Sequence, residues 1–251
     1  MTTVLWLWVA AVAVIGVVAA ATVRAAVFHY GVSSEEPWRT RCPFCETEIV
    51  RPGWGIVASA LRASGRCPHC NRSIGPRPAV VELLAALTLG VLAWGAGFEV
   101  ATVGLIWAAL VALVLALVDV AVHRLPDRLI LAALAGTIVV FGIAAVTTGD
   151  YHRLGVAVAC GLGCGIAYFA IVFLTPSGMG LGDAKLSVLV GLTCGWFGIR
   201  TAIVAIFAGI IFAGLSAIAL LLTRRVTRRD RIAYGPFMLL GALAAVVLAT
   251  I

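Results

Sequence analysis

Long apolar runs without a charged residue are the feature that most limits how this chain can fold. Residues 4–23 form one such run, and 63% of the whole chain is hydrophobic while only 12% is charged. Soluble domains carry about 25% charged residues, so this chain has too little polar surface to cover a globular fold. Disordered chains are poor in apolar residues, which excludes that class too. The remaining class is a membrane protein.

Eight runs are apolar enough to be membrane spans, each of which needs about 20 such residues. The first has no basic segment before it and is too long for the apolar core of a signal peptide, so we expect it to remain as a helix. The short run at 184–197 could enter the protein interior without crossing the bilayer completely. The predicted fold is an all-α polytopic membrane protein with about eight transmembrane helices, at residues 4–23, 79–94, 100–118, 129–147, 154–174, 184–197, 201–222 and 232–251.

The distribution of basic residues predicts the orientation of these spans. All Lys and Arg residues except Arg153 and Arg200 fall in the loops after the first, third, fifth and seventh runs. Basic residues near span ends stay in the cytoplasm, so these loops are predicted to be cytoplasmic and both termini to lie outside. The basic cluster at residues 224–231 fits contact with anionic lipid at a span end, and nucleic acid is not expected as a partner.

The loop between the first two runs contains two Cys-x-x-Cys pairs. They are Cys42 with Cys45 and Cys67 with Cys70. Two such pairs can supply four thiolates to one tetrahedral zinc ion, which four protein ligands make structural and not catalytic. Two disulfides are the alternative, but a cytoplasmic loop is reducing. The chain therefore divides into a first transmembrane helix at 1–28, a cytoplasmic zinc-binding loop domain at 29–78, and a transmembrane core of about seven helices at 79–251.

Two aspartates are not explained by loop or helix-end positions. Asp119 lies in the last turns of the span that starts at residue 100, and ionisable residues at such depth usually mark a functional site. Asp183 ends the glycine-rich segment at 178–183, which lies on the same predicted side of the membrane. Asp127 and Glu82 have a simpler interpretation, because acidic residues favour helix N-termini.

Three interpretations of this aspartate pair remain open from spacing alone. Two carboxyl groups in a poorly hydrated site cannot both ionise cheaply, so a shared proton would suit peptide hydrolysis. Lys185 or Arg124 could instead neutralise one aspartate in an ion pair. The pair could also relay protons or cations in a transporter or a zinc-stabilised scaffold, although no inverted repeat is seen.

The order of five motifs resembles the type IV prepilin peptidases. Those motifs are the two cysteine pairs, the Val-Glu-Leu-Leu at 81–84, Asp119 six residues before Leu-Pro-Asp at 125–127, the Gly-Met-Gly-Leu-Gly-Asp-Ala-Lys-Leu at 178–186, and the Tyr-Gly-Pro-Phe at 234–237. Presenilin-like proteases share the Gly-x-Gly-Asp feature, but they have Tyr where Val118 stands here and a Pro-Ala-Leu that this chain lacks.

This resemblance implies an aspartic endopeptidase of the bacterial inner membrane that removes the leader of prepilins or pseudopilins at the cytoplasmic face. It implies that Asp119 and Asp183 are catalytic and that the four cysteines bind zinc. Many members also methylate the new N-terminus with S-adenosylmethionine. This activity stays open here, because the chain departs from the family pattern at residues 25–37 and 51–55. Glu46, Glu48 and Glu82 are weak candidates for binding a basic leader, and the oligomeric state is not predicted.

Overall fold

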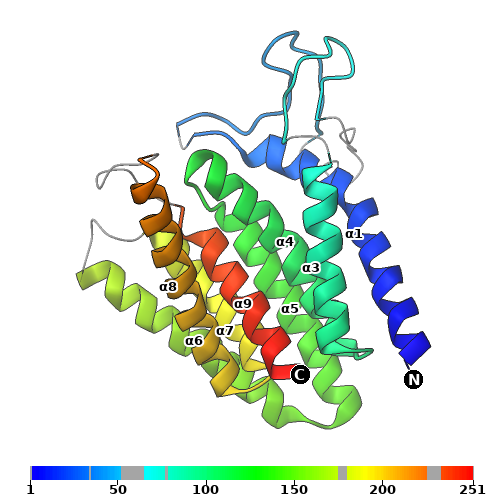
Figure 1. The fold of residues 1–251 in the computed structure, drawn as a ribbon, viewed down its shortest axis with the longest axis vertical. Coiled ribbons are helices and arrows are strands. Elements are labelled where there is room, and N and C mark those ends of the chain that lie inside the picture. Colours follow the sequence, from blue (N-terminus) through cyan, green and yellow to red (C-terminus); the bar gives the residue numbers. More distant parts are fainter. Residues whose placement is uncertain are drawn as a thin grey trace.

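The computed structural model describes residues 2–33, 35–51, 65–76, 79–174, 180–224 and 233–250. Within these ranges the chain is all-α, and its regular elements are eight helices (Figure 1). They are α1 (Thr2–Tyr30), α3 (Val80–Ala96), α4 (Val100–Val122), α5 (Asp127–Thr148), α6 (Tyr151–Leu174), α7 (Leu181–Gly195), α8 (Ile199–Leu222) and α9 (Gly235–Thr250). Each of the eight predicted spans corresponds to one helix, so the predicted fold class is confirmed.

Five of the helices, α1, α4, α5, α6 and α8, are long and apolar enough to cross a membrane. Helices α3 and α9 are apolar but shorter. Many large apolar side chains on α1, α6 and α8 are exposed, among them Leu7, Ile166 and Phe207. Exposed apolar surface of this extent is expected where lipid replaces water. The chain is therefore a membrane protein.

Helix α7 lies at the centre of the bundle and packs against α4, α5, α6, α8 and α9. Its residues from Leu189 to Leu192 are all buried. Glycines set its distance from α6, since a Cβ at Gly191 would lie only 2.5 Å from the carbonyl oxygen of Cys160. At 1.5 Å per residue, 15 residues span about 22 Å, less than the hydrocarbon core of about 30 Å. Enclosure by protein explains how so short a helix is accommodated.

The end of the first helix differs from the prediction. The first apolar run was predicted to end at residue 23, but α1 continues to Tyr30. Arg24 is fully buried, and its guanidinium group contacts both carboxylate oxygens of Glu82 on α3, at 2.8 and 2.6 Å. This ion pair neutralises the charge, so the helix does not have to end where the arginine occurs.

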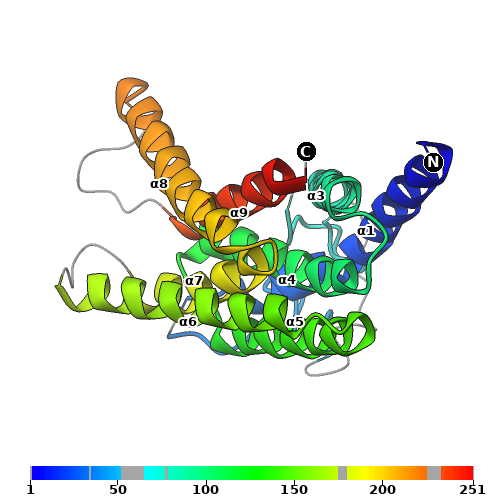
Figure 2. The ribbon, with the colours of Figure 1, turned by 90° about the horizontal axis from the view of Figure 1, so that it is seen from below.

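Both chain ends lie at the same end of the bundle, opposite the cysteine-containing loops (Figure 1). Viewed from below, α5 and α6 form one side of the molecule, α4 and α7 lie inside them, and the pairs α1 with α3 and α8 with α9 extend from the other side (Figure 2). Asp119 near the C-terminal end of α4 and Asp183 in the first turn of α7 are thereby set at one end of the central helices.

Candidate active site and metal centre

Asp119 is held by the start of α9. Its side chain is 6% exposed, and its Oδ2 accepts a hydrogen bond of 3.1 Å from the backbone N–H of Gly235. A Cβ at Gly235 would lie 2.8 Å from the same oxygen, closer than real Cβ contacts come. Glycine is therefore needed there for the backbone of α9 to reach the carboxylate.

Asp183 is half-buried in the first turn of α7. Its Oδ2 accepts a long hydrogen bond of 3.4 Å from the N–H of Gly180, the residue that caps this helix. A Cβ at Gly182 would lie 3.0 Å from the Leu125 side chain, so the glycine segment packs directly on the turn that follows α4. The first two residues of the predicted glycine-rich segment, 178 and 179, lie outside the described residues.

The structure places the two predicted aspartates on neighbouring helices near the start of α9, since a Cβ at Gly235 would lie 2.8 Å from Asp119 Oδ2 and 3.5 Å from Leu186, one turn along α7 from Asp183. The cations named in the ion-pair interpretation have other partners. Lys185 Nζ lies 2.7 Å from Oδ1 of Asp127, and the Arg124 guanidinium lies 4.3 Å from the centre of the Trp38 ring. The arrangement thus favours the interpretations in which the aspartates act on a proton or a ligand.

Two tyrosines border this site, and sequence reasoning missed one of them. The hydroxyl oxygens of Tyr168 on α6 and Tyr234 are 3.1 Å apart, and Tyr234 immediately precedes Gly235. Tyr234 belongs to the motif quoted above, whereas nothing in the local sequence around Tyr168 marks it. Its partner lies 66 residues away, so only the fold could reveal the contact.

The four predicted cysteine ligands converge. Their Sγ atoms all lie within 4.8 Å of one another, and the pairs Cys42–Cys70 and Cys45–Cys67 are each separated by 3.7 Å. A tetrahedral zinc site with Zn–S bonds of about 2.3 Å requires sulfur atoms about 3.8 Å apart. All seven cysteines are free thiols, so the disulfide alternative is not realised in this structure. The donor set therefore fits one metal ion.

The two cysteine turns share the same backbone design. In each, the first cysteine accepts a hydrogen bond from the residue after the second cysteine, and that residue, Glu46 or Asn71, has a positive φ of 55° or 57°. An isolated antiparallel bridge closes each turn. The Thr47 side chain and then its backbone lower the pKa of Cys45 to about 6, whereas, against a backbone hydrogen bond that lowers it, burial and the neighbouring thiols raise the pKa of Cys70 to about 11.

Beneath these turns lies a buried cluster that the sequence did not reveal. Arg24 donates a hydrogen bond of 2.9 Å to the carbonyl oxygen of Pro76, just after the second cysteine turn, in addition to its ion pair with Glu82. The cluster ties the cysteine segment to α1 and α3. Because both of its oxygens contact Arg24, Glu82 is a poor candidate for binding a basic leader.

Comparison with known proteins agrees with this geometry. Residues 105–218 match the type IV leader peptidase family, and residues 14–96 match the bacterial peptidase A24 N-terminal domain. No solved structure matches significantly. A prepilin leader peptidase/N-methyltransferase of Aeromonas salmonicida (strain A449) is 31% identical over 220 residues, which are 83% of this chain and 71% of that protein.

A second relative with the same name, from Pseudomonas aeruginosa, is 28% identical over 212 residues, covering 82% of this chain and 70% of that protein. The similarity thus extends over most of both chains and includes the segments that carry the cysteines and the aspartates. The resemblance drawn from the five motifs is confirmed: this chain belongs to the type IV leader peptidase family.

Proposed function

We propose that this protein is a membrane aspartic endopeptidase that removes the leader peptide of type IV prepilins or pseudopilins, with Asp119 and Asp183 as its catalytic residues. The observation that supports the proposal is the position of Asp119 beside Gly235 at the start of α9, with the first turns of α7 that carry Asp183 packed against the same glycine, in a chain whose relatives are named as leader peptidases.

The chemistry needs one carboxylate and one carboxylic acid. The ionised aspartate accepts a proton from water as the water oxygen attacks the scissile carbonyl carbon, while the protonated aspartate donates a hydrogen bond to the carbonyl oxygen. The C–N bond then breaks, and the leaving amine takes up the proton that the first aspartate received from water, which returns the pair to one carboxylate and one acid. The Gly235 N–H bond to Asp119 and the Gly180 N–H bond to Asp183 hold the two side chains in position.

We propose that the protein lies in the inner membrane of a bacterium and that its aspartate site is at the cytoplasmic face. The distribution of Lys and Arg supports this orientation through the preference of basic residues for the cytoplasmic side. The cysteine loops would then be cytoplasmic too, and both termini would lie outside. The termini share one end of the bundle, as this topology requires (Figure 1).

Purified protein incubated with a candidate prepilin, with and without S-adenosylmethionine, tests the function by mass spectrometry. Loss of the leader mass is expected. An added methyl mass that depends on S-adenosylmethionine would assign the N-methyltransferase activity that the relatives' names contain. If several prepilins all remain intact, the peptidase proposal fails and an ion-binding role for the aspartates gains support.

We further propose that the cysteine cluster binds structural zinc. Cys42→Ser is expected to lose most of the metal that copurifies with the wild type, because three thiolates no longer complete a tetrahedral site. Elemental analysis of the purified protein measures this. Cys160→Ala, which removes a thiol from α6, should keep the wild-type metal content. Retention of wild-type zinc by Cys42→Ser would contradict the assignment.

Gly235→Ala is expected to lower leader cleavage strongly without unfolding the protein. The new Cβ would lie 2.8 Å from Asp119 Oδ2 and displace the carboxylate. A misplacement of about 1 Å can cost roughly 100-fold in rate. The measurement is the initial rate of leader removal. Gly142→Ala is the matched control, since a Cβ there meets nothing within 4 Å. Equal rates in both variants would show that Gly235 does not position the aspartate.

A further inference from the structure

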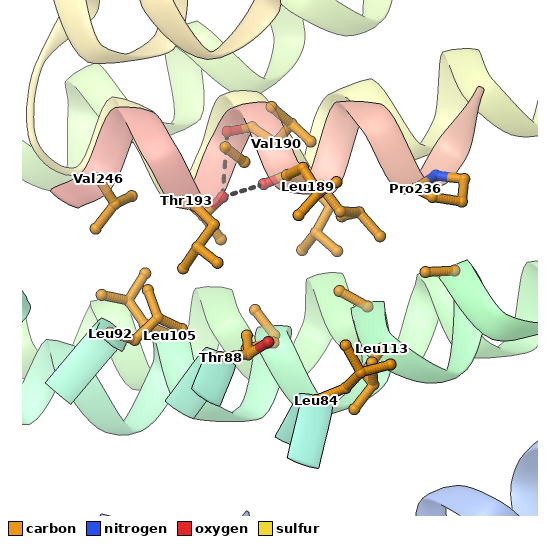
Figure 3. A pocket seen from close by; sticks show the side chains of 18 of the residues that line it. Leu84, Thr88, Leu92, Leu105, Leu113, Leu189, Val190, Thr193, Pro236 and Val246 are labelled. Atoms are coloured by element: carbon orange, nitrogen blue, oxygen red, sulfur yellow. Dashed lines mark hydrogen bonds between the residues drawn. The ribbon is translucent and has the colours of Figure 1, made fainter. Parts of the chain in front are cut away.

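A long apolar groove lies among α3, α4, α7 and α9. It encloses about 290 Å³. In Figure 3, Leu189, Val190 and Thr193 of α7, with Pro236 and Val246 of α9, face Leu84, Leu92, Leu105 and Leu113 of α3 and α4 across an open gap. The lining is almost wholly aliphatic. The groove therefore suits an apolar partner.

Helix α4 provides one wall along most of its length. The lining residues of α4 run from Leu105 to Val120, a distance of about 22 Å at 1.5 Å per residue. Within this stretch Ala109, Ala112 and Ala116 recur at intervals of three and four residues, so they share one helix face. Small residues on such a face allow another helix to approach closely within a membrane.

One end of the groove lies close to Asp119. Val120, which lines it, directly follows Asp119 in α4. Pro236, on the opposite wall, directly follows Gly235, whose N–H binds Asp119. Leu189 and Val190 belong to the helix that begins beside Asp183. A chain lying in the groove would thus have one end near Asp119.

The groove is also open to its surroundings. Leu84, Val120 and Leu240 are 38%, 61% and 50% exposed. The Thr193 hydroxyl inside the groove donates to the carbonyl oxygens of Leu189 and Val190, so this hydroxyl does not require a polar partner from a bound ligand. A partner could enter sideways from the bilayer with no need to pass through water.

We propose that this groove binds the apolar helix of the substrate that continues from the leader, so that the scissile bond comes to rest at Asp119 and Asp183. The inference rests on the proposed leader peptidase function. The groove ends close to Asp119, and its length matches about 15 residues of helix. The occupant is therefore a transmembrane helix attached to the cleaved peptide.

Photo-crosslinking tests this docking without requiring cleavage. Benzoylphenylalanine replaces Leu240 on the groove or, as the matched control, the exposed Leu131 on α5. Each full-length variant is reconstituted in phospholipid vesicles with an intact prepilin, illuminated, and analysed by mass spectrometry. Wild-type protein is assayed in parallel for leader removal. A crosslink from position 240 to the apolar helix of the prepilin, and none from position 131, is expected.

The outcomes separate the two proposals. A crosslink at position 240 without leader removal by the wild type would support docking and overturn the peptidase function. Three outcomes, each accompanied by leader removal, would overturn docking alone. They are no crosslink at position 240, equal crosslinks at positions 240 and 131, and crosslinks only to phospholipid or to a second copy of this chain. If the experiment gives no crosslink at position 240 and the wild type removes no leader, both the docking proposal and the peptidase proposal fail.

Filling the groove gives an independent measurement. Ala112→Phe is expected to raise the KM for intact prepilin roughly tenfold with little change in kcat, because lost binding shared by ground and transition states acts on KM. Ala135→Phe, at an exposed alanine of α5, should leave KM unchanged. An unaltered KM in a folded Ala112→Phe protein would overturn the docking site.

Discussion

Replacement of Asp119 or Asp183 by asparagine is expected to lower the rate of leader cleavage by roughly 10²–10⁴-fold, the range typical of a lost acid or base. Asparagine keeps the size of the side chain but cannot accept or donate the proton. For Asp119 it can still accept the Gly235 N–H bond through its amide oxygen, so the start of α9 should remain in place. Rates are measured on intact prepilin by following leader loss.

Asp127→Asn is the matched control for this loss, because it makes the same chemical change at the same end of the bundle. Asp127 contacts Lys185, and its side chain is 62% exposed, so Asp127→Asn removes a surface ion pair and a charge at the start of α5. Its cleavage rate should stay close to that of the wild type. If Asp119→Asn or Asp183→Asn cleaves as fast as Asp127→Asn, the catalytic assignment is wrong.

The helices could be predicted because the bilayer imposes a local rule. An apolar run of sufficient length must become a helix, and a charge normally marks its end. The rule predicted all eight helices but misplaced the end of α1, where Arg24 is paired with a residue 58 positions away. No local pattern identifies such a partner. A charge inside a helix is therefore ambiguous until its partner is known.

The cysteine cluster and the aspartate site also differ in how far they depend on contacts between residues distant in the sequence. Each cysteine pair forms a local turn, and the four-ligand chemistry of a metal then joins the two turns, so the cluster could be predicted from spacing. Asp119 could be singled out by its depth in an apolar run, but the residue that binds it, Gly235, lies 116 positions away. The apolar groove was equally hidden, because it is formed by helices from both halves of the chain.

Glu82→Gln is expected to destabilise the folded protein by about 3 kcal/mol, near the lower end of the range for breaking a buried ion pair. The Arg24 side chain is 0% exposed, so its charge would be left in the interior without a counter-charge. The Pro76 carbonyl oxygen would still accept one of its hydrogen bonds, which limits the loss. In a chain of this size the apparent Tm should fall by about 10 °C.

Thermal unfolding in detergent micelles measures the effect, with Glu99→Gln as the matched control. Glu99 lies 3.9 Å from Arg153 with both side chains more than half exposed, so its loss should cost about 0–1 kcal/mol. The double variant Arg24→Leu/Glu82→Leu should recover most of the stability, because no buried charge then remains unpaired. Metal content should not change in any of these variants, since all four candidate ligands are cysteines of the loops. A Tm for Glu82→Gln equal to that of Glu99→Gln would contradict a stabilising role for the Arg24–Glu82 ion pair.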